Sequence, residues 1–232
     1  MKTKNKSILL YALIIAMGGL LMGFDASVIS GVVKFIEPEF SLSKIELGWA
    51  VASLSLTATI AMMFAGPISD KLGRNVVLKY SALLYFFSAI LSAVAPSFLI
   101  LVIARLIAGI GVGLSLILAP MYIAEISPSE KRGKMVSFNQ LNIVIGISVA
   151  FFTNYLIVHL ASSNTEWVQL LKIKEYNWRW MLGIEAFPAL LYYIFLFFVP
   201  QSPRWLLMKG RYDEALIIMK KLGDDETAEK MI

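Results

Sequence analysis

Six long apolar runs, separated by short polar stretches, take up most of the 232-residue chain. Each is close to the roughly 20 residues that a helix needs to cross the hydrocarbon core of a bilayer. The predicted spans are Ile8–Val33, Ile45–Gly66, Val76–Ala95, Phe98–Ile126, Val136–Ala161 and Trp178–Pro200. The expected fold is therefore an all-α membrane protein, with a six-helix transmembrane bundle over residues 1–200 in which the first three and the last three spans cross the bilayer in opposite senses.

Residues 201–232 are more polar and predict a cytoplasmic helical linker. Ser202 followed by Pro203 is typical of a helix start, and a second helix is expected from Tyr212 to a stop at Gly223. Its apolar stripe consists of Ala215, Ile218, Met219 and Leu222. The stripe is interpreted as packing against the base of the bundle, and a solvated tail with an accidental stripe is the alternative.

Composition and charge agree with a membrane protein. Hydrophobic residues make up 58% of the chain and charged residues only 16%, and the mean hydropathy is +0.73. The net charge of +5 comes from Lys and Arg gathered in the loops on one side, which predicts cytoplasmic termini in a multi-pass protein of the plasma or inner membrane. Topology explains this charge better than a nucleic-acid partner, and the absence of Cys excludes disulfides and thiolate metal sites.

Three ionisable residues stand out inside the predicted spans: Asp25, Arg105 and Glu185. Counted at 1.5 Å per residue from the outer ends of their spans, all three lie roughly 10–12 Å deep. Because charges are costly in a bilayer, this common depth predicts one interior site. Two readings stay open: a proton-coupling site, in which small rearrangements change protonation, or a static ion network that holds the first, fourth and sixth helices together.

Amide side chains are the second polar feature of the spans. Gln140 and Asn154, fourteen residues apart in the fifth span, fall on nearly the same helical face. Amides offer donors and acceptors without charge, which suits a neutral, hydroxyl-rich ligand such as a sugar or polyol. Hydrogen bonding between helices is the alternative for either residue.

Catalytic motifs are lacking. The single histidine, His159, lies near the outer end of the fifth span, and neither a zinc-binding HExxH pattern nor a phosphate-binding loop is present. We therefore expect no enzymatic activity, no metal and no cofactor, with a proton as the coupling ion.

Four motifs carry a family resemblance. They are the helix 1 run from Gly23 to Gly31, the GPISDKLGR turn at 66–74, the PMYIAEISP segment at 120–128 leading to Arg132, and PQSPRWL at 200–206. Their order and spacing resemble the sugar porter family of the major facilitator superfamily over essentially the whole chain. The resemblance implies the fold of the amino-terminal half of a twelve-span transporter, with its six helices arranged as two inverted three-helix repeats.

The resemblance also implies roles for individual residues. Asp25 would accept the proton, Arg105 and Glu185 would complete its network, and Gln140 would contact sugar hydroxyls. A cytoplasmic gate network would consist of Asp70, Arg74, Glu125, Arg132 and Arg204. The sequence departs from the family pattern at two positions. Gln201 stands where the family usually has Glu, and Asn75 stands where a second basic residue often follows Arg74.

The resemblance covers only half of a sugar porter, whose binding site lies between two six-helix halves. A six-helix half exposes a polar face, so we expect a second half, or a second copy of this chain, as partner. The favoured function is secondary active transport of a monosaccharide or polyol by proton symport. The alternatives are a non-transporting sensor or regulator and a truncated, nonfunctional fragment.

Overall fold

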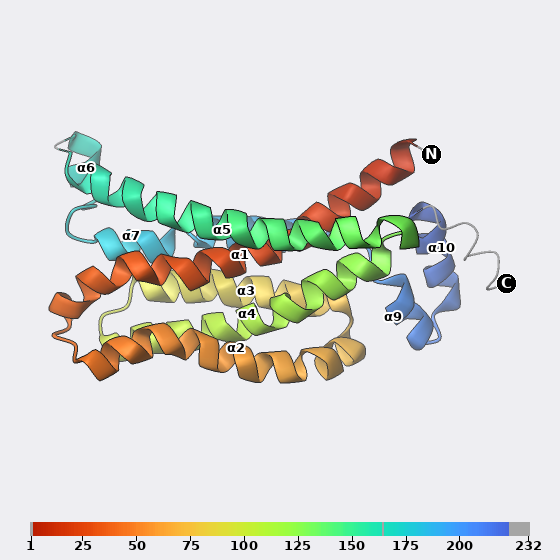
Figure 1. Cartoon of the computed structure of the whole chain (residues 1–232), viewed down its shortest axis with the longest axis horizontal. Helices are drawn as coiled ribbons and strands as arrows, with labels where there is room; N and C mark the ends of the chain where they lie inside the picture. Colours follow the sequence, from red (N-terminus) through yellow and green to blue (C-terminus); the bar gives the residue numbers. More distant parts are fainter. Residues whose placement is uncertain (1, 164, 223–232) are drawn as a thin grey trace.

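A computed structural model describes residues 2–163 and 165–222, and side chains from Ile8 onward. These ranges form an elongated bundle of helices (Figure 1). The long helices are α1 (Lys2–Glu39), α2 (Lys44–Leu72), α3 (Arg74–Ala93), α4 (Phe98–Ile126) and α5 (Arg132–Ala161). The shorter ones are η1 (Ser129–Lys131), α6 (Glu166–Leu170), α7 (Asn177–Gly183), α8 (Ala186–Phe195), α9 (Pro203–Met208) and α10 (Tyr212–Leu222).

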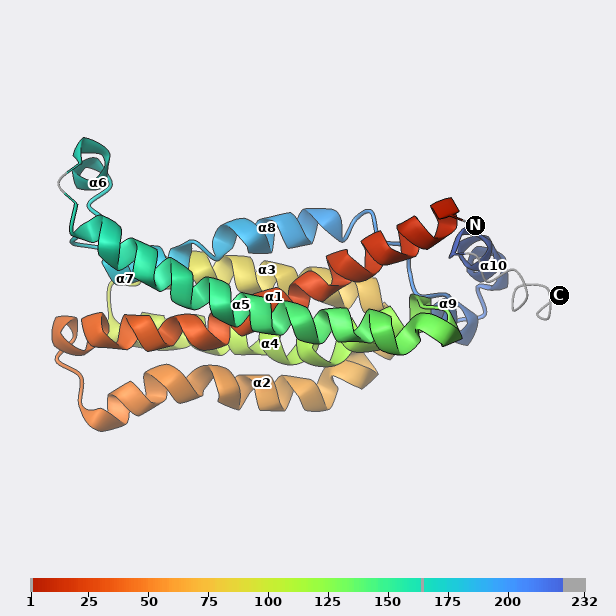
Figure 2. The same ribbon diagram turned by 45° about the horizontal axis from the view of Figure 1, so that its top comes forward.

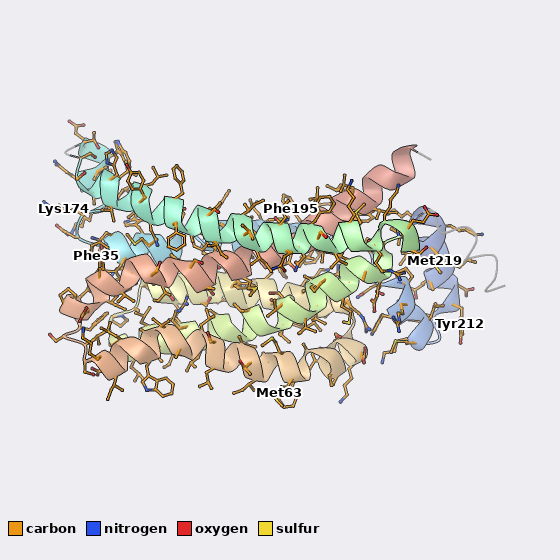
Figure 3. The ribbon with its side chains drawn as sticks, viewed as in Figure 1. Phe35, Met63, Lys174, Phe195, Tyr212 and Met219 are labelled. Atoms are coloured by element: carbon orange, nitrogen blue, oxygen red, sulfur yellow. The ribbon has the colours of Figure 1, made fainter. Side chains whose placement is uncertain are left out.

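Helices α1 to α5 contain most or all of each of the first five predicted spans, and α1 and α2 extend beyond theirs. Within the described ranges they are the five that are long and apolar enough to cross a membrane. Many large apolar side chains on them face outward; Met63 on α2, for example, is 73% exposed and points away from the bundle (Figure 3). Such a surface is unfavourable in water and suits lipid or a further protein layer.

The sixth segment differs from the prediction of one continuous helix. It is divided into α7 and α8, with a break at Ile184 and Glu185. Pro188 explains the interruption, because proline has no N–H to donate to the carbonyl four residues earlier, which is that of Ile184. Instead the Phe187 N–H donates to that carbonyl at 3.3 Å, a tighter turn than the α-helical one.

Helix α4 lies at the centre of the bundle and packs against α1, α2 and α3, while α8 lies along α3 (Figure 2). Helices α1 and α5 cross closely. A Cβ atom added to Gly146 on α5 would collide with the backbone carbonyl of Leu20 on α1, and one added to Gly23 would collide with that of Ile143. The two backbones therefore touch, as small residues allow in membrane helices.

We call the end of the bundle that carries the α2–α3 turn, the α4–α5 connection, α9 and α10 the basic end (Figure 1). At its α2–α3 turn a single residue, Gly73 with φ +96°, reverses the chain. The predicted apolar stripe of α10 packs against the bundle at this end. Ala215, Met219 and Leu222 are buried, and Leu222 belongs to the main hydrophobic core. The tail thus packs on the bundle; the predicted stop at Gly223 lies outside the described residues, and the division into bundle and linker stays a prediction.

Candidate functional site

The three intramembrane ionisable residues meet in the interior of the bundle. Asp25 comes from α1, Arg105 from α4 and Glu185 from the break between α7 and α8, and each is only 2% exposed. Arg105 Nη1 forms an ion pair with Asp25 Oδ1. Arg105 Nη2 donates to the Asp25 main-chain carbonyl at 3.0 Å, so the guanidinium holds both the side chain and the backbone of α1.

Glu185 is the third member of this group, and we call Asp25, Arg105 and Glu185 the buried triad. With Glu185 the group has two acidic side chains for one basic side chain. Glu185 is close enough to Asp25 and Arg105 to interact electrostatically with both. Within the described residues, Asp25 Oδ2 and Glu185 Oε1 are buried without a hydrogen-bond partner. Two carboxylates share one guanidinium, and binding of a single proton would balance the charge of the triad. Uncompensated charge is costly away from water, and a proton bound at either carboxylate would lower the cost of burying this group.

The two predicted sugar-binding amides are placed differently. Gln140 is exposed on the surface of α5, whereas Asn154 is 7% exposed. Asn154 Nδ2 donates to the Val28 carbonyl of α1 at 3.0 Å, which is the interhelical bond that the sequence left open. Its Oδ1 is buried without a partner among the described residues.

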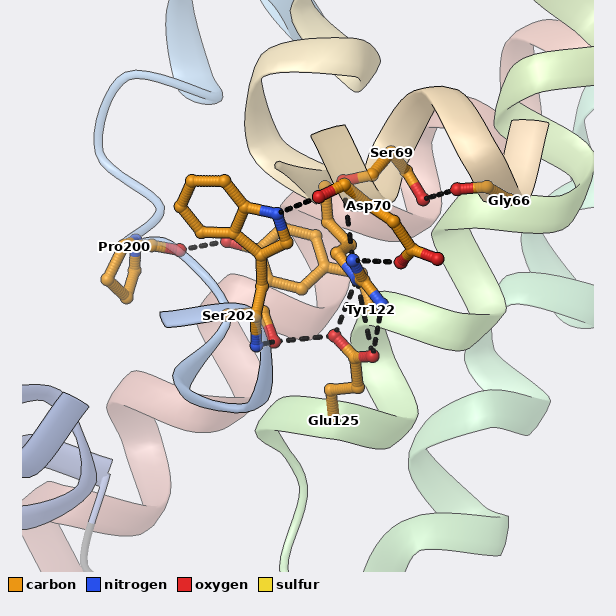
Figure 4. Close-up of polar contacts among 9 residues, drawn as sticks. Gly66, Ser69, Asp70, Tyr122, Glu125, Pro200 and Ser202 are labelled. Carbon is orange, nitrogen blue, oxygen red and sulfur yellow. Dashed lines mark hydrogen bonds and ion pairs between the residues drawn. The ribbon is translucent and has the colours of Figure 1, made fainter. Parts of the chain in front are cut away.

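At the basic end, Arg74 is the hub of a charge network with Asp70 and Glu125, both labelled in Figure 4. Its Nη1 lies 2.8 Å from Asp70 Oδ1, one helical turn away across the α2–α3 reversal. Its Nε and Nη2 both donate to the Glu125 carboxylate of α4, at 3.1 and 3.2 Å. Arg74 and Glu125 are both buried at 5% side-chain exposure, so this fork joins three helices at one point.

The segment after α8 closes onto the same network. Ser202 Oγ donates to Glu125 Oε2 at 2.5 Å and also caps α9 by accepting from the Trp205 N–H. Trp205 Nε1 donates to the Asp70 carbonyl at 3.1 Å. Sequence motifs alone indicated the charged members; Ser202 and Trp205 are additions that only the structure places here.

The other two predicted gate residues lie at the rim of this network. Arg132 is exposed and its Nε donates to the Ala124 carbonyl at 3.0 Å. Arg204, also exposed, lines with Arg132, Arg74 and Glu125 a cavity of about 440 Å³. The structure therefore brings all five predicted residues to one end of the bundle, three in direct contact and two around the cavity.

Asn75, noted in the sequence only as a departure, fastens the end of the sixth segment. Its Nδ2 donates to the carbonyls of Leu196 and Val199, each at 2.9 Å. The neighbouring Tyr122 hydroxyl donates to the Pro200 carbonyl. A carbonyl beyond the end of a helix lacks a helical donor, and these side chains supply one. The partners of Asn75 are more than 120 residues away along the chain and that of Tyr122 is 78 residues away, so no local pattern reveals them.

The opposite end has a network that the sequence did not indicate. Glu39, at the end of α1, accepts from Trp178 Nε1 at 2.5 Å and from Arg179 Nη2 at 3.1 Å. Arg179 Nη1 also donates to the Ala95 carbonyl at 2.6 Å. Helix α7 is thereby fixed to α1 and to the α3–α4 turn, immediately before the break at Glu185.

Comparison with known proteins agrees with this architecture. A family described as "Sugar (and other) transporter" matches residues 11–232. The chain belongs to this family. These sugar porters are transporters of the major facilitator superfamily and not enzymes, and the chain is accordingly a multi-pass membrane protein.

Three similar proteins place the chain within the sugar porters. It is 40% identical over 208 residues to a D-xylose transporter of Levilactobacillus brevis, covering 90% of this chain and 42% of the relative. It is 36% identical over 246 residues to the D-xylose-proton symporter of Escherichia coli K12, covering 95% and 49%. A proton:xylose symporter solved with 6-bromo-6-deoxy-D-glucose superposes with a TM-score of 0.88 at 34% identity, covering 98% of this chain and 53% of that one. The chain thus spans about half the length of these relatives.

Proposed function

We propose that this sugar porter chain forms one half of a proton-coupled monosaccharide or polyol transporter. The buried triad carries the proposal: two acids and one base, each 2% exposed, with carboxylate oxygens of Asp25 and Glu185 left without a partner in the described chain. An uncompensated charge inside a membrane is energetically costly, and ionisable residues retained there mark functional sites. Similarity to symporters of D-xylose supports the same function.

In this proposal Asp25 is the proton-accepting group. Protonation weakens its ion pair with Arg105, which frees the guanidinium to interact with Glu185. Because Arg105 also bonds the Asp25 main-chain carbonyl at 3.0 Å, loss of the pair changes how α1 is held against α4. The proton thereby alters helix packing, as coupled transport requires.

The sugar is proposed to bind against α5. Gln140, exposed on that helix, supplies an uncharged donor and acceptor for sugar hydroxyls. The Asn154 Oδ1, buried and unpartnered among the described residues, supplies an acceptor whose position is set by the bond from Nδ2 to Val28. The remaining contacts come from a second six-helix unit, in line with relatives about twice this length.

We further propose that the basic end is cytoplasmic and that its charge network is the inner gate. The loops there carry most of the Lys and Arg residues, as the positive-inside rule requires. The Arg74 fork to Asp70 and Glu125 closes this end, and opening breaks it, with Arg132 and Arg204 as nearby alternative partners for the released carboxylates.

Uptake of labelled D-xylose into proteoliposomes under an imposed pH gradient tests the function. The chain would be reconstituted alone and with a second six-helix unit of the family. Asp25→Asn is expected to abolish uptake against a gradient while exchange of labelled for unlabelled sugar persists. Glu37→Gln, on the same helix but in an exposed pair with Lys44, is the matched control.

Retention of full concentrative uptake by Asp25→Asn would refute the proton role. Uptake by the chain alone would show that two copies complete the site, and uptake only with the second unit would show that it is one half of a carrier. Absence of both uptake and exchange in each preparation would refute transport and favour a regulatory membrane protein.

A further inference from the structure

Glu185 is the member of the buried triad whose position its own side chain does not explain. It is 2% exposed, and its Oε1 is buried without a hydrogen-bond partner among the described residues. Asp25, in contrast, is held by its ion pair with Arg105. The position of the Glu185 carboxyl group therefore depends on the backbone that carries it, at the break between α7 and α8.

The packing of α7 leaves this backbone room to move. Because Pro188 interrupts the helical hydrogen bonds at Ile184, α7 is not a rigid continuation of α8. One side of α7 also borders a cavity of about 670 Å³, whose lining includes Ala93, Gly183 and Ile184. The segment immediately before Glu185 is therefore fixed neither by α8 nor by close packing on that side, and its position requires attachments of its own.

Glu39, the last residue of α1, provides one attachment, at the end of the bundle opposite the basic end (Figure 1). Its Oε2 accepts from Trp178 Nε1 at 2.5 Å and its Oε1 accepts from Arg179 Nη2 at 3.1 Å, so both carboxylate oxygens are used. Trp178 and Arg179 are consecutive residues in the first turn of α7. The ring of Phe40, next to Glu39, packs edge-on against Trp178 with centroids 5.9 Å apart. The end of α1 thus holds the start of α7.

Arg179 joins the same turn of α7 to a third part of the bundle. Its Nη1 donates to the Ala95 carbonyl in the α3–α4 turn at 2.6 Å, and its guanidinium lies 4.3 Å from the centroid of the Trp178 ring. The ion pair with Glu39 is partly exposed, so solvent screens it and its contribution to stability is small. Its effect is on geometry, because bonds to two different elements fix α7 in two directions.

The remaining turn of α7 connects this attachment to the triad. Met181 and Leu182 are 0% and 2% exposed, and they belong to the same hydrophobic cluster as Phe24 and Val28, which lie on either side of Asp25 in α1. Glu185 follows only three residues after Leu182. A movement of the first turn of α7 would therefore be transmitted both to the packing around Asp25 and to the backbone of Glu185.

We propose that Glu39, Trp178 and Arg179 are positioning residues for the buried triad, which hold α7 so that Glu185 stays within the triad. They act through the backbone of α7 and do not take the proton themselves. Without them α7 shifts toward the adjacent cavity and carries Glu185 with it, which leaves Asp25 paired with Arg105 alone. This inference rests on the proposed function, in which the triad exchanges the coupled proton.

Glu39→Ala tests the proposal, because it removes the acceptors of both Trp178 and Arg179. In proteoliposomes prepared with a second six-helix unit of the family, uptake of labelled D-xylose against a gradient is expected to fall by about tenfold to a hundredfold, since a misplacement of about 1 Å can cost about a hundredfold in rate. Exchange of labelled for unlabelled sugar should persist. Glu39→Gln keeps one acceptor oxygen and should recover part of the loss. Glu37→Gln, in an exposed pair with Lys44, should have no effect.

Infrared spectroscopy provides a second readout, which separates positioning from a general loss of structure and needs no transport. The absorption band of the Glu185 carboxyl group is the one that Glu185→Gln removes. Glu39→Ala should shift this band, because the surroundings of the carboxyl group change, whereas Glu37→Gln should leave it in place. Arg179→Lys keeps the charge next to Glu39 but cannot bond Glu39 and the Ala95 carbonyl with the same fork, so it should shift the band as well.

The outcomes distinguish this inference from the proposed function. A Glu185 band that is unshifted in Glu39→Ala would overturn the positioning role, whatever the effect on uptake, and would leave proton coupling intact. Absence of uptake by the unmodified protein together with the second unit would refute the proposed function instead, and the infrared comparison would still decide whether Glu39 positions Glu185.

Discussion

Asn75 provides a direct test of how the sixth segment is held. Its amide donates two hydrogen bonds of 2.9 Å to the carbonyls of Leu196 and Val199, both of which belong to buried residues. Asn75→Ala removes both bonds and leaves two buried acceptors. At about 0.5–1.5 kcal/mol for each bond, the free energy of unfolding should fall by about 2 kcal/mol. That corresponds to a roughly thirtyfold change in the unfolding equilibrium constant.

Equilibrium unfolding in mixed detergent micelles would measure this loss. Asn142→Ala is the matched control, because among the described residues the Asn142 amide hydrogen-bonds only to the Phe138 carbonyl of its own helix. Asn75→Asp should be worse than Asn75→Ala, since a carboxylate would face two carbonyl oxygens. Equal stability of Asn75→Ala and Asn142→Ala would refute the view that the side chain anchors the segment after α8.

Three further predictions concern packing and charge. Gly146→Ala should destabilise the protein by about 1–3 kcal/mol, because the α1–α5 crossing has no room for a methyl group. Gly48→Ala is the control, since Gly48 has open space around it and the change should be neutral or slightly stabilising. Thermal unfolding compares the two variants. Arg74→Lys should loosen the basic end, because an ammonium group cannot bond two carboxylates as a fork; faster proteolysis of the α9–α10 region would show it. Trp178→Phe should cost about 1 kcal/mol through the lost hydrogen bond to the end of α1; an unchanged unfolding free energy would contradict this.

Much of the helical architecture could be predicted from the sequence, because long apolar runs leave the backbone few alternatives in a membrane. The fourth span was predicted at Phe98–Ile126, the bounds that α4 has. The end of α1 was not predicted correctly, because the polar residues after Val33 suggested a loop. The helix continues to Glu39, since Ile36 is buried and Glu39 hydrogen-bonds to Trp178 of α7. The break in the sixth segment was missed too, although Pro188 is a local signal for it.

The candidate site was partly accessible to the same reasoning. Counting along helices brought Asp25, Arg105 and Glu185 to one depth, and the structure places the first two in an ion pair with the third beside them. Periodicity was a poorer guide on α5, where Gln140 is exposed but Asn154 is buried against α1. Which neighbour covers a helical face depends on tertiary packing, and that information is not local.

The close crossing of α1 and α5 has a mechanical consequence. With carbonyls of each backbone pressed against glycines of the other, these helices cannot slide or tilt independently, because close-packed contacts resist compression. The two helices therefore move as one rigid body, which carries Asp25 on α1 and Gln140 and Asn154 on α5. In the proposed transporter, a displacement of α5 by a bound sugar would reach the carboxylate of Asp25 as a rigid displacement and would not be dissipated between the two helices.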